Sequence, residues 1–141
     1  MKEKYLGLDL GTKTCGVSIA NVTKSLIFPV KTIRFNREDY DACAKEVEKI
    51  IKEKSITDVV IGLPKNMDGS LGFATDRTLN FIPKLENMGV KVHTVDERLT
   101  SVEAERLLHD CDLKSKEFKD RVDMEAAILI LESYLRSLND D

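Results

Sequence analysis

The sequence lacks the features that mark membrane, secreted and multidomain proteins. No run of apolar residues approaches the length of about 18 that a membrane-spanning helix requires. The first strand-like run begins at Tyr5, so we expect no secretory leader before it. Linkers, internal repeats and low-complexity tracts are also missing. We therefore expect residues 1–141 to form a single cytoplasmic domain with no membrane attachment.

Cysteine is scarce, and its spacing matches no cysteine framework. The three cysteines, Cys15, Cys43 and Cys111, are odd in number and contain no Cys-x-x-Cys pair. A disulfide framework usually has an even number of cysteines at regular spacings. We expect reduced packing residues, as in cytosolic proteins, where thiols are kept reduced.

An excess of positive charge is absent as well. Lysine and arginine number 22 against 25 acidic residues, which gives a net charge of −3. This balance argues against general attraction to nucleic acid or membrane, but it is compatible with a local basic face on an acidic body. The composition, 42% hydrophobic and 33% charged, is that of a globular protein. A chain of this size can bury roughly 68–70% of the surface that its unfolded form exposes.

The periodicity of the apolar residues predicts an α/β fold. We predict strands over residues 5–10, 15–20, 26–34, 58–62 and 90–95, and helices over 36–54, 74–88, 100–110 and from 121–123 onward. Short turns join the first three strands, which indicates an antiparallel meander. The later strands alternate with helices, which indicates parallel pairing. The expected result is a five-stranded mixed sheet, with its first three strands antiparallel and with helices on both faces.

Several element boundaries are expected from local signals. Asn36 fits a helix cap, with two acids in the first turn after it. Pro83 is expected to kink or interrupt its helix. Residues 112–120 are expected to form a polar connector, so that the last helix begins at 121–123. The apolar face of that helix is wide, which indicates burial against the sheet.

Three acids stand at the ends of predicted elements. Asp9 ends the first strand before a glycine turn, Glu97 follows the last strand, and Asp123 falls in the first turn of the last helix. Ligands of α/β proteins usually bind at the carboxyl ends of the strands, where such acids gather. Mg²⁺ prefers oxygen ligands and keeps several waters, so two or three carboxylates with substrate phosphate complete its shell. The three acids therefore predict a metal site that handles phosphate.

Each acid also has a simpler interpretation. Asp9 is compatible with a turn residue beside glycine, although the apolar strand before it argues against this. Glu97 alone fits an ordinary loop acid equally well. Asp123 alone fits an acid that complements the helix dipole, worth roughly 0.3–1 kcal/mol. The combination of three acids at three element ends favours the metal site.

Other residues suit phosphate binding. Backbone N–H groups around Gly11 and Thr12, with Lys13 beside them, are suitable donors, and Lys65 with Asn66 offers a second donor pair. Cations in the predicted connector fit either a solvated linker or a nucleic-acid contact; they are Lys114, Lys116, Lys119 and Arg121. His93, within an apolar strand, is expected to be a core or edge residue rather than a ligand. His109 is expected to complement a helix dipole.

Four segments together resemble the signature segments of the YqgF family, which is also called RuvX. They read GLDLGTK from Gly7, GLPKNMDG from Gly62, DERLT from Asp96 and VDMEAA from Val122. The second and third segments are specific, the first alone is not, and the resemblance covers essentially the whole chain. It implies a ribonuclease H-like fold similar to RuvC-type resolvases and a bacterial cytoplasmic protein.

The resemblance also implies an activity and its residues. The family is linked to nucleolytic maturation of the 5′ end of precursor 16S ribosomal RNA and, by analogy, to junction resolution. Asp9, Glu97 and Asp123 become the catalytic acids and the ligands of Mg²⁺ or Mn²⁺. The expected substrate-binding residues are Gly11, Thr12, Lys13, Lys65, Asn66, Arg98 and Arg121. Arg98 also fits a structural partner of nearby acids.

These features lead to a metal-dependent nuclease as the principal hypothesis. The expected partners are precursor ribosomal RNA, favoured over a DNA junction, and ribosomal precursor particles, with the protein acting as a monomer or a homodimer. Two departures from the family pattern stand out: Asn21, where an acid is common, and Pro83. Two alternatives remain: an ATP-handling protein, for which one domain supplies one of the two lobes needed, and a non-catalytic nucleic-acid-binding module.

Overall fold

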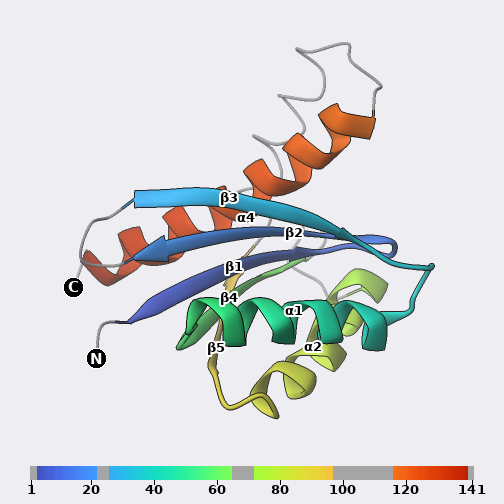
Figure 1. The fold of residues 1–141 in the computed structure, drawn as a ribbon, viewed down its shortest axis with the longest axis horizontal. Coiled ribbons are helices and arrows are strands. Elements are labelled where there is room, and N and C mark those ends of the chain that lie inside the picture. Colours follow the sequence, from blue (N-terminus) through green and yellow to red (C-terminus); the bar gives the residue numbers. More distant parts are fainter. Residues whose placement is uncertain (1–2, 22–25, 65–71, 97–115, 140–141) are drawn as a thin grey trace.

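The computed structural model describes residues 3–21, 26–64, 72–96 and 116–139 (Figure 1). Its strands are β1 (Lys4–Leu10), β2 (Thr14–Asn21), β3 (Leu26–Arg34), β4 (Asp58–Leu63) and β5 (Lys91–Asp96). Its helices are α1 (Tyr40–Lys54), α2 (Phe73–Glu86) and α4 (Lys116–Asn139). The helix predicted over residues 100–110, together with His109 and Cys111, lies outside the described residues.

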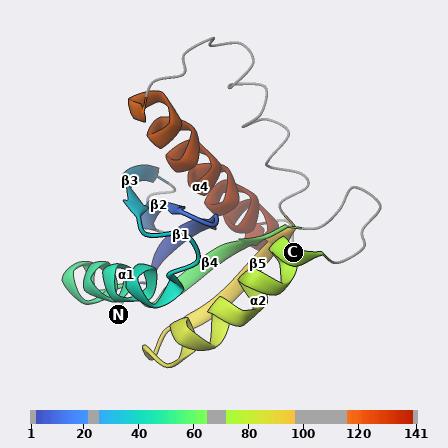
Figure 2. The same cartoon turned by 90° about the vertical axis from the view of Figure 1, so that its right-hand side faces the viewer.

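The five strands form one mixed sheet in the order β3-β2-β1-β4-β5. β1 pairs antiparallel with β2, and β2 pairs antiparallel with β3, whereas β4 runs parallel to both β1 and β5. The predicted fold class, an antiparallel first half and a parallel second half, is confirmed. The carboxyl ends of β1, β4 and β5 consequently lie along the same edge of the sheet (Figure 2).

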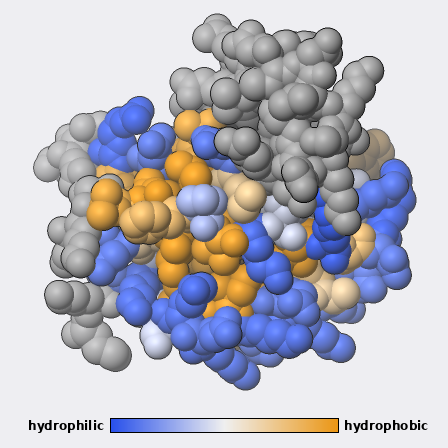
Figure 3. All heavy atoms as spheres, turned by 45° about the horizontal axis from the view of Figure 1, so that its top comes forward, coloured by the Kyte–Doolittle hydropathy of each residue, from blue (hydrophilic) through white to orange (hydrophobic). Residues whose placement is uncertain are grey.

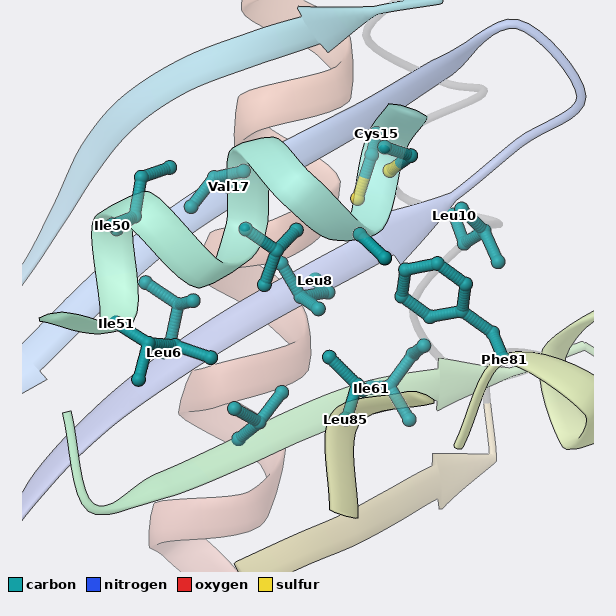
Figure 4. Packing of buried hydrophobic residues seen from close by; sticks show 14 of the residues in the cluster. Leu6, Leu8, Leu10, Cys15, Val17, Ile50, Ile51, Ile61, Phe81 and Leu85 are labelled. Carbon is teal, nitrogen blue, oxygen red and sulfur yellow. The ribbon is translucent and has the colours of Figure 1, made fainter. Parts of the chain in front are cut away.

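Helices cover both faces of the sheet, as predicted. α1 and α2 lie on one face and α4 lies on the other (Figures 1 and 2). Leu6 and Leu8 of β1 point into the larger core with Phe81 of α2 (Figure 4). Tyr5, on the opposite face of the same strand, packs in a second cluster with Leu131 of α4. Because side chains alternate along a strand, Asp9 lies on the α4 face.

The sequence placed the start of α1 too early. The helix begins at Tyr40, and Asp39 rather than Asn36 is its cap, accepting a 3.2 Å hydrogen bond from Ala42 N–H. The residues before the helix form hydrogen bonds with the hairpin between β1 and β2. Glu38 adopts a positive φ of 62° and donates its N–H to the Thr12 carbonyl at 2.8 Å. This tertiary contact keeps the residues before Tyr40 out of the helix, and the spacing of apolar residues in the sequence gives no indication of it.

Pro83 does not interrupt α2, contrary to the expectation. The helix continues to Glu86, with Pro83 in its last turn. A proline this close to the helix end removes one amide donor yet leaves the earlier turns intact. The Met88 position, included in the predicted helix, lies past its end.

The last helix begins earlier than predicted. α4 starts at Lys116, so the final part of the expected connector, including Lys116 and Lys119, is helical. Lys and Glu are strong helix formers, and a charged stretch rich in them resembles a linker only by its polarity. Asp123 therefore lies about two turns inside the helix rather than in its first turn.

The outer edge of the sheet at β3 is largely exposed. Leu26 and Phe28 have exposed fractions of 51% and 55%, whereas Ile33 near the other end of the strand is buried. Figure 3 looks onto this side of the molecule and shows apolar residues gathered among hydrophilic ones. Pro29 within β3 removes one backbone donor, which is tolerated at an edge strand.

Candidate functional site

Asp9 lies near the carboxyl end of β1, on the face of the sheet that α4 covers. It is half-buried and is the direct antiparallel partner of Gly16 in β2. Partners in an antiparallel pair have Cα atoms about 4.5–5.5 Å apart and point to the same face. Gly16 contributes no side chain to this face, so the space beside Asp9 is open to another element.

Asp123 of α4 occupies that space. A Cβ atom built at Gly16 would collide with the Asp123 backbone carbonyl and would lie 3.2 Å from the Asp123 Cβ. The helix backbone therefore rests directly on β2 at the residue paired with Asp9. Two of the three predicted acids, 114 residues apart in the chain (123 − 9), are brought together.

The negative charges of Asp9 and Asp123 both raise the pKa of the Cys15 thiol. Cys15 is fully buried beside Gly16, and its pKa is raised well above the usual value. The first cause is a hydrogen bond with Cys43, followed by burial, and the negative charges of Asp9 and Asp123 add to it. Both acids therefore lie within electrostatic range of this one buried thiol. Both cysteines are free thiols, as the sequence predicted.

Close contacts further along hold α4 on the sheet. Ser18 is fully buried and donates its hydroxyl to the Ala127 carbonyl at 2.8 Å. Gly7 of β1, which pairs with Ser18, also lies close to the helix. A Cβ atom at Gly7 would lie 2.8 Å from the Ala127 carbonyl oxygen and 2.7 Å from Leu131 Cγ. Such short separations require glycine, because any larger residue would displace the helix.

The hairpin that follows Asp9 is tied to the rest of the fold. Gly11 N–H closes the turn on Thr14 O at 2.7 Å, so this donor is used within the hairpin. The Thr12 and Lys13 carbonyls accept bonds from the segment between β3 and α1, while Lys13 itself is exposed. The hairpin therefore presents Lys13 at the carboxyl end of β1. Gly11 shapes the turn rather than offering its N–H to phosphate.

Other predicted site residues lie outside the described part of the chain. They are Glu97, Lys65, Asn66 and Arg98. Asp96, the last residue of β5, pairs with Leu63 of β4 at the same edge of the sheet as Asp9. Arg121 lies within α4, whose backbone is described there. Within the described ranges, no group of three or more His, Cys, Asp or Glu residues is placed to hold a metal ion.

The donor set still suits a hard divalent cation. Asp9 and Asp123 offer carboxylate oxygens from two elements that the backbone packing holds in fixed relation. Mg²⁺ and Mn²⁺ prefer such oxygen ligands and are commonly held by one or two carboxylates together with substrate phosphate. The two acids therefore fit a site of this kind.

His93 is a packing residue, as the sequence indicated. Its Nε2 lies 2.8 Å from Asp58 Oδ2, and its ring stacks on Tyr134 of α4 with centroids 4.7 Å apart. Asp58 is the first residue of β4, so it lies at the opposite end of the strands from Asp9. This cluster joins β4, β5 and α4 away from the two acids.

Sequence reasoning missed the residues that bring the acids together. Gly16 and Ser18 appeared only as part of a strand, yet both contact α4. A signal was present, because a glycine inside an apolar strand often marks the close approach of another backbone. The sequence did not indicate which element approaches.

Comparison with known proteins identifies the family. A family model described as "RuvX: Holliday junction resolvase" matches residues 3–137. The chain belongs to the RuvX family. Within it, a Staphylococcus epidermidis protein named "Putative pre-16S rRNA nuclease" is 38% identical over 140 residues, covering 98% of this chain and 99% of that protein. An Oceanobacillus iheyensis protein of the same name is 41% identical over 135 residues, covering 94% and 97%.

Solved structures show which fold the RuvX chain shares. Thermus thermophilus RuvC superposes with a TM-score of 0.61 at 11% identity, covering 97% of this chain and 96% of that one. The fowlpox virus Holliday junction resolvase superposes with a TM-score of 0.57 at 16% identity, covering 95% and 99%. The fold is therefore that of RuvC-like resolvases, the ribonuclease H-like class, as the resemblance implied. None of the described helices has the length and apolar character needed to cross a membrane.

Proposed function

We propose that this protein is a metal-dependent endonuclease that hydrolyses phosphodiester bonds in structured RNA. The observation that carries the proposal is the packing of Asp123 on Gly16, the strand partner of Asp9, in a chain of the RuvX family. Ligands of α/β folds usually bind at the carboxyl ends of the strands, and acids brought together there suit metal-assisted phosphate chemistry.

The proposed substrate is the 5′ end region of precursor 16S ribosomal RNA. The support is the name shared by relatives that are 36–41% identical over nearly the whole chain. The proposed partners follow from the substrate: precursor ribosomal RNA, free or within ribosomal precursor particles, in the cytoplasm. Trimming RNA requires no two-fold symmetry, so a monomer suffices for this reaction, whereas a homodimer would suit a symmetric junction.

The proposed roles divide between acids and cations. Asp9 and Asp123 would hold Mg²⁺ or Mn²⁺, with Glu97 as the third acid. The ion would supply Lewis acidity and charge neutralisation at the scissile phosphate. Lys13, exposed on the hairpin after Asp9, would contact the RNA backbone. Thr12, Lys65, Asn66, Arg98 and Arg121 are the further proposed backbone contacts, while Gly11 gives the hairpin its shape.

The rigid backbone contact explains how the chain itself would contribute. Metal-binding carboxylates work best when their positions are set before substrate arrives, since no reorganisation is then needed. Asp9 sits on a paired strand, and Asp123 sits on a helix that touches the neighbouring strand through backbone atoms. Both acids are therefore held by elements of regular structure rather than by loops.

A second candidate function is the resolution of four-way DNA junctions. The description of the matching family model, Holliday junction resolvase, favours it. The two candidates share the acids and differ in polymer and symmetry. A purely binding role is the third possibility, and it predicts that RNA binding is unchanged by metal and that no strand is cut.

The test is a cleavage assay on a precursor 16S RNA fragment and on a four-way DNA junction, with Mg²⁺, Mn²⁺ or chelator. We expect metal-dependent cutting of the RNA that Asp9→Asn abolishes. Asp41→Asn is the matched control, because Asp41 is a surface acid paired with Lys84 at 2.6 Å on the α1 side of the sheet. Cutting of the junction alone would favour the resolvase. Chelator-resistant cutting, or equal activity of Asp9→Asn, would refute the proposal.

A further inference from the structure

The apolar surface of α4 does not define how the helix is rotated about its axis. Six consecutive apolar residues, 126–131, cover more than one full turn at 3.6 residues per turn. Ala126, Ala127, Ile130 and Leu131 are buried, while Ile128 and Leu129 between them are partly buried. A rotated helix would still present apolar side chains to the sheet. Hydrophobic contact therefore determines how closely α4 packs on the sheet better than it determines the rotation of α4 about its own axis.

Ser18 supplies a contact that does depend on rotation. Its hydroxyl donates to the Ala127 carbonyl at 2.8 Å, and the serine is fully buried in β2. A hydrogen bond is directional and weakens steeply away from its preferred geometry. The bond therefore forms only when the Ala127 carbonyl is turned toward the sheet.

The rotation of α4 decides where Asp123 lies. Asp123 precedes Ala127 by four residues, which places both on nearly the same side of the helix. When Ala127 faces Ser18, the Asp123 backbone faces Gly16 and hence the strand partner of Asp9. Gly16 and Gly7 permit this close approach, but neither has a side chain that could donate a hydrogen bond to the helix.

We propose that Ser18 is a positioning residue that sets the rotation of α4 and thereby places Asp123 beside Asp9 for metal binding. The inference rests on the proposed function, because it assumes that the two acids share a metal ion. Ser18 touches neither the substrate nor the ion in this account. It acts through the helix backbone. Residues that do not touch a metal ion commonly orient the residues that do.

The direct test is Mn²⁺ binding to the purified protein without nucleic acid, measured by electron paramagnetic resonance or calorimetry. Ser18→Ala removes the hydroxyl and leaves the surrounding shape almost unchanged. We expect the concentration of Mn²⁺ for half-saturation to rise on the order of tenfold. Ser18→Cys keeps a weak donor on a larger atom, so its Mn²⁺ affinity should fall between those of the native protein and Ser18→Ala.

Ser137→Ala is the matched control. Ser137 is also a serine that donates to an α4 carbonyl, that of Tyr134 at 2.6 Å, but it is exposed and bonds within its own helix. Its removal should leave Mn²⁺ affinity unchanged. Circular dichroism at the binding temperature checks that each variant is folded, and a purely structural role for Ser18 would lower the melting temperature without changing affinity in the folded sample.

Two acid variants separate failure of this inference from failure of the proposed function. If Asp9→Asn and Asp123→Asn weaken Mn²⁺ binding while folded Ser18→Ala binds like the native protein, the positioning role of Ser18 is overturned and the metal site stands. If neither acid variant changes Mn²⁺ binding, the metal site itself is wrong, and the inference about Ser18 falls with it.

Discussion

The backbone of Asp123 packs against Gly16, at the one position in β2 that pairs directly with Asp9. The contact leaves no room for a Cβ atom on Gly16. The helix backbone thus contacts the sheet beside Asp9, and the absence of a side chain at Gly16 makes that contact possible.

Gly16→Ala is expected to reduce both stability and cleavage. The added methyl group collides with the Asp123 carbonyl, so α4 must move away from β2. Overpacking of this kind usually costs about 1–3 kcal/mol of unfolding free energy. Cleavage should fall further than stability explains, since the displaced residue is one of the two acids. Denaturant unfolding and the RNA cleavage assay, both on folded protein, measure the two effects.

Gly11→Ala is the control for that substitution. A Cβ at Gly11 would lie 3.2 Å from the Thr14 carbonyl, which is tight but requires only a small adjustment of the hairpin. It should therefore cost less in both assays. Equal losses for the two variants would argue against a special role for the contact between Gly16 and Asp123.

Thr75→Val is expected to weaken RNA binding. Thr75 is buried, accepts a bond from Gly72 N–H at 3.3 Å and donates to the Pro64 carbonyl, so it joins the two ends of the segment that carries Lys65 and Asn66. Valine has the same shape without the hydroxyl, and an unpaired buried group costs about 1–3 kcal/mol. If Lys65 and Asn66 contact RNA, the dissociation constant should rise severalfold, as measured by fluorescence anisotropy.

Thr78→Val supplies the comparison on the same helix. Thr78 is equally buried, but its hydroxyl donates to Ala74 within α2. This variant should bind RNA as tightly as the native protein. A similar loss of affinity in both variants would show that general destabilisation of α2, and not the segment after β4, accounts for the effect.

Stability is expected to fall in alkaline solution because of two tyrosines. Burial, first among the causes, raises the pKa of both Tyr5 and Tyr134 above the usual value of 10.0, and the negative charge of Asp58 adds to the effect. A raised pKa in the folded state means that the unfolded chain loses its protons first. The stabilisation is therefore complete below pH 10.0 and is lost as the pH rises through the folded-state values.

Tyr5→Phe tests this alkaline loss. Phenylalanine keeps the ring that packs 5.7 Å from Tyr134 but carries no ionisable group. The unfolding free energy of the variant should decline less steeply above pH 10.0 than that of the native protein. Urea unfolding at several alkaline pH values gives the slope, and identical slopes would contradict the prediction.

The sequence predicted the parts of the fold that local patterns determine. A short apolar run before a glycine turn marked the strand that carries Asp9, and the change to helical periodicity marked α1. The starts of α1 and α4 were misplaced, since Asp39 rather than Asn36 caps the first and Lys116 opens the second. At α1 a tertiary contact of Glu38 with the hairpin decided the boundary, and at α4 a charged stretch rich in helix formers resembled a linker only by its polarity.

The sequence pointed to the acids of the candidate site, but not to the packing that brings Asp9 and Asp123 near each other. Asp9 and Asp123 stood out by their positions at element ends, although Asp123 proved to lie inside its helix. That location weakens the helix-dipole interpretation, because the dipole effect is confined to the first turn. The role of Gly16 depends on which helix crosses which strand, and no local pattern contains that information.

Asp9 and Asp123 act as one unit in the proposed reaction. The most direct measurement is a double-mutant cycle of the Mn²⁺-dependent RNA cleavage rate with Asp9→Asn, Asp123→Asn and the double variant. Residues that serve a single catalytic unit lose activity non-additively. We predict that each single variant loses nearly all activity and that the double variant is no worse than the more impaired single one. Losses that multiply independently, or a fully active single variant, would contradict the account.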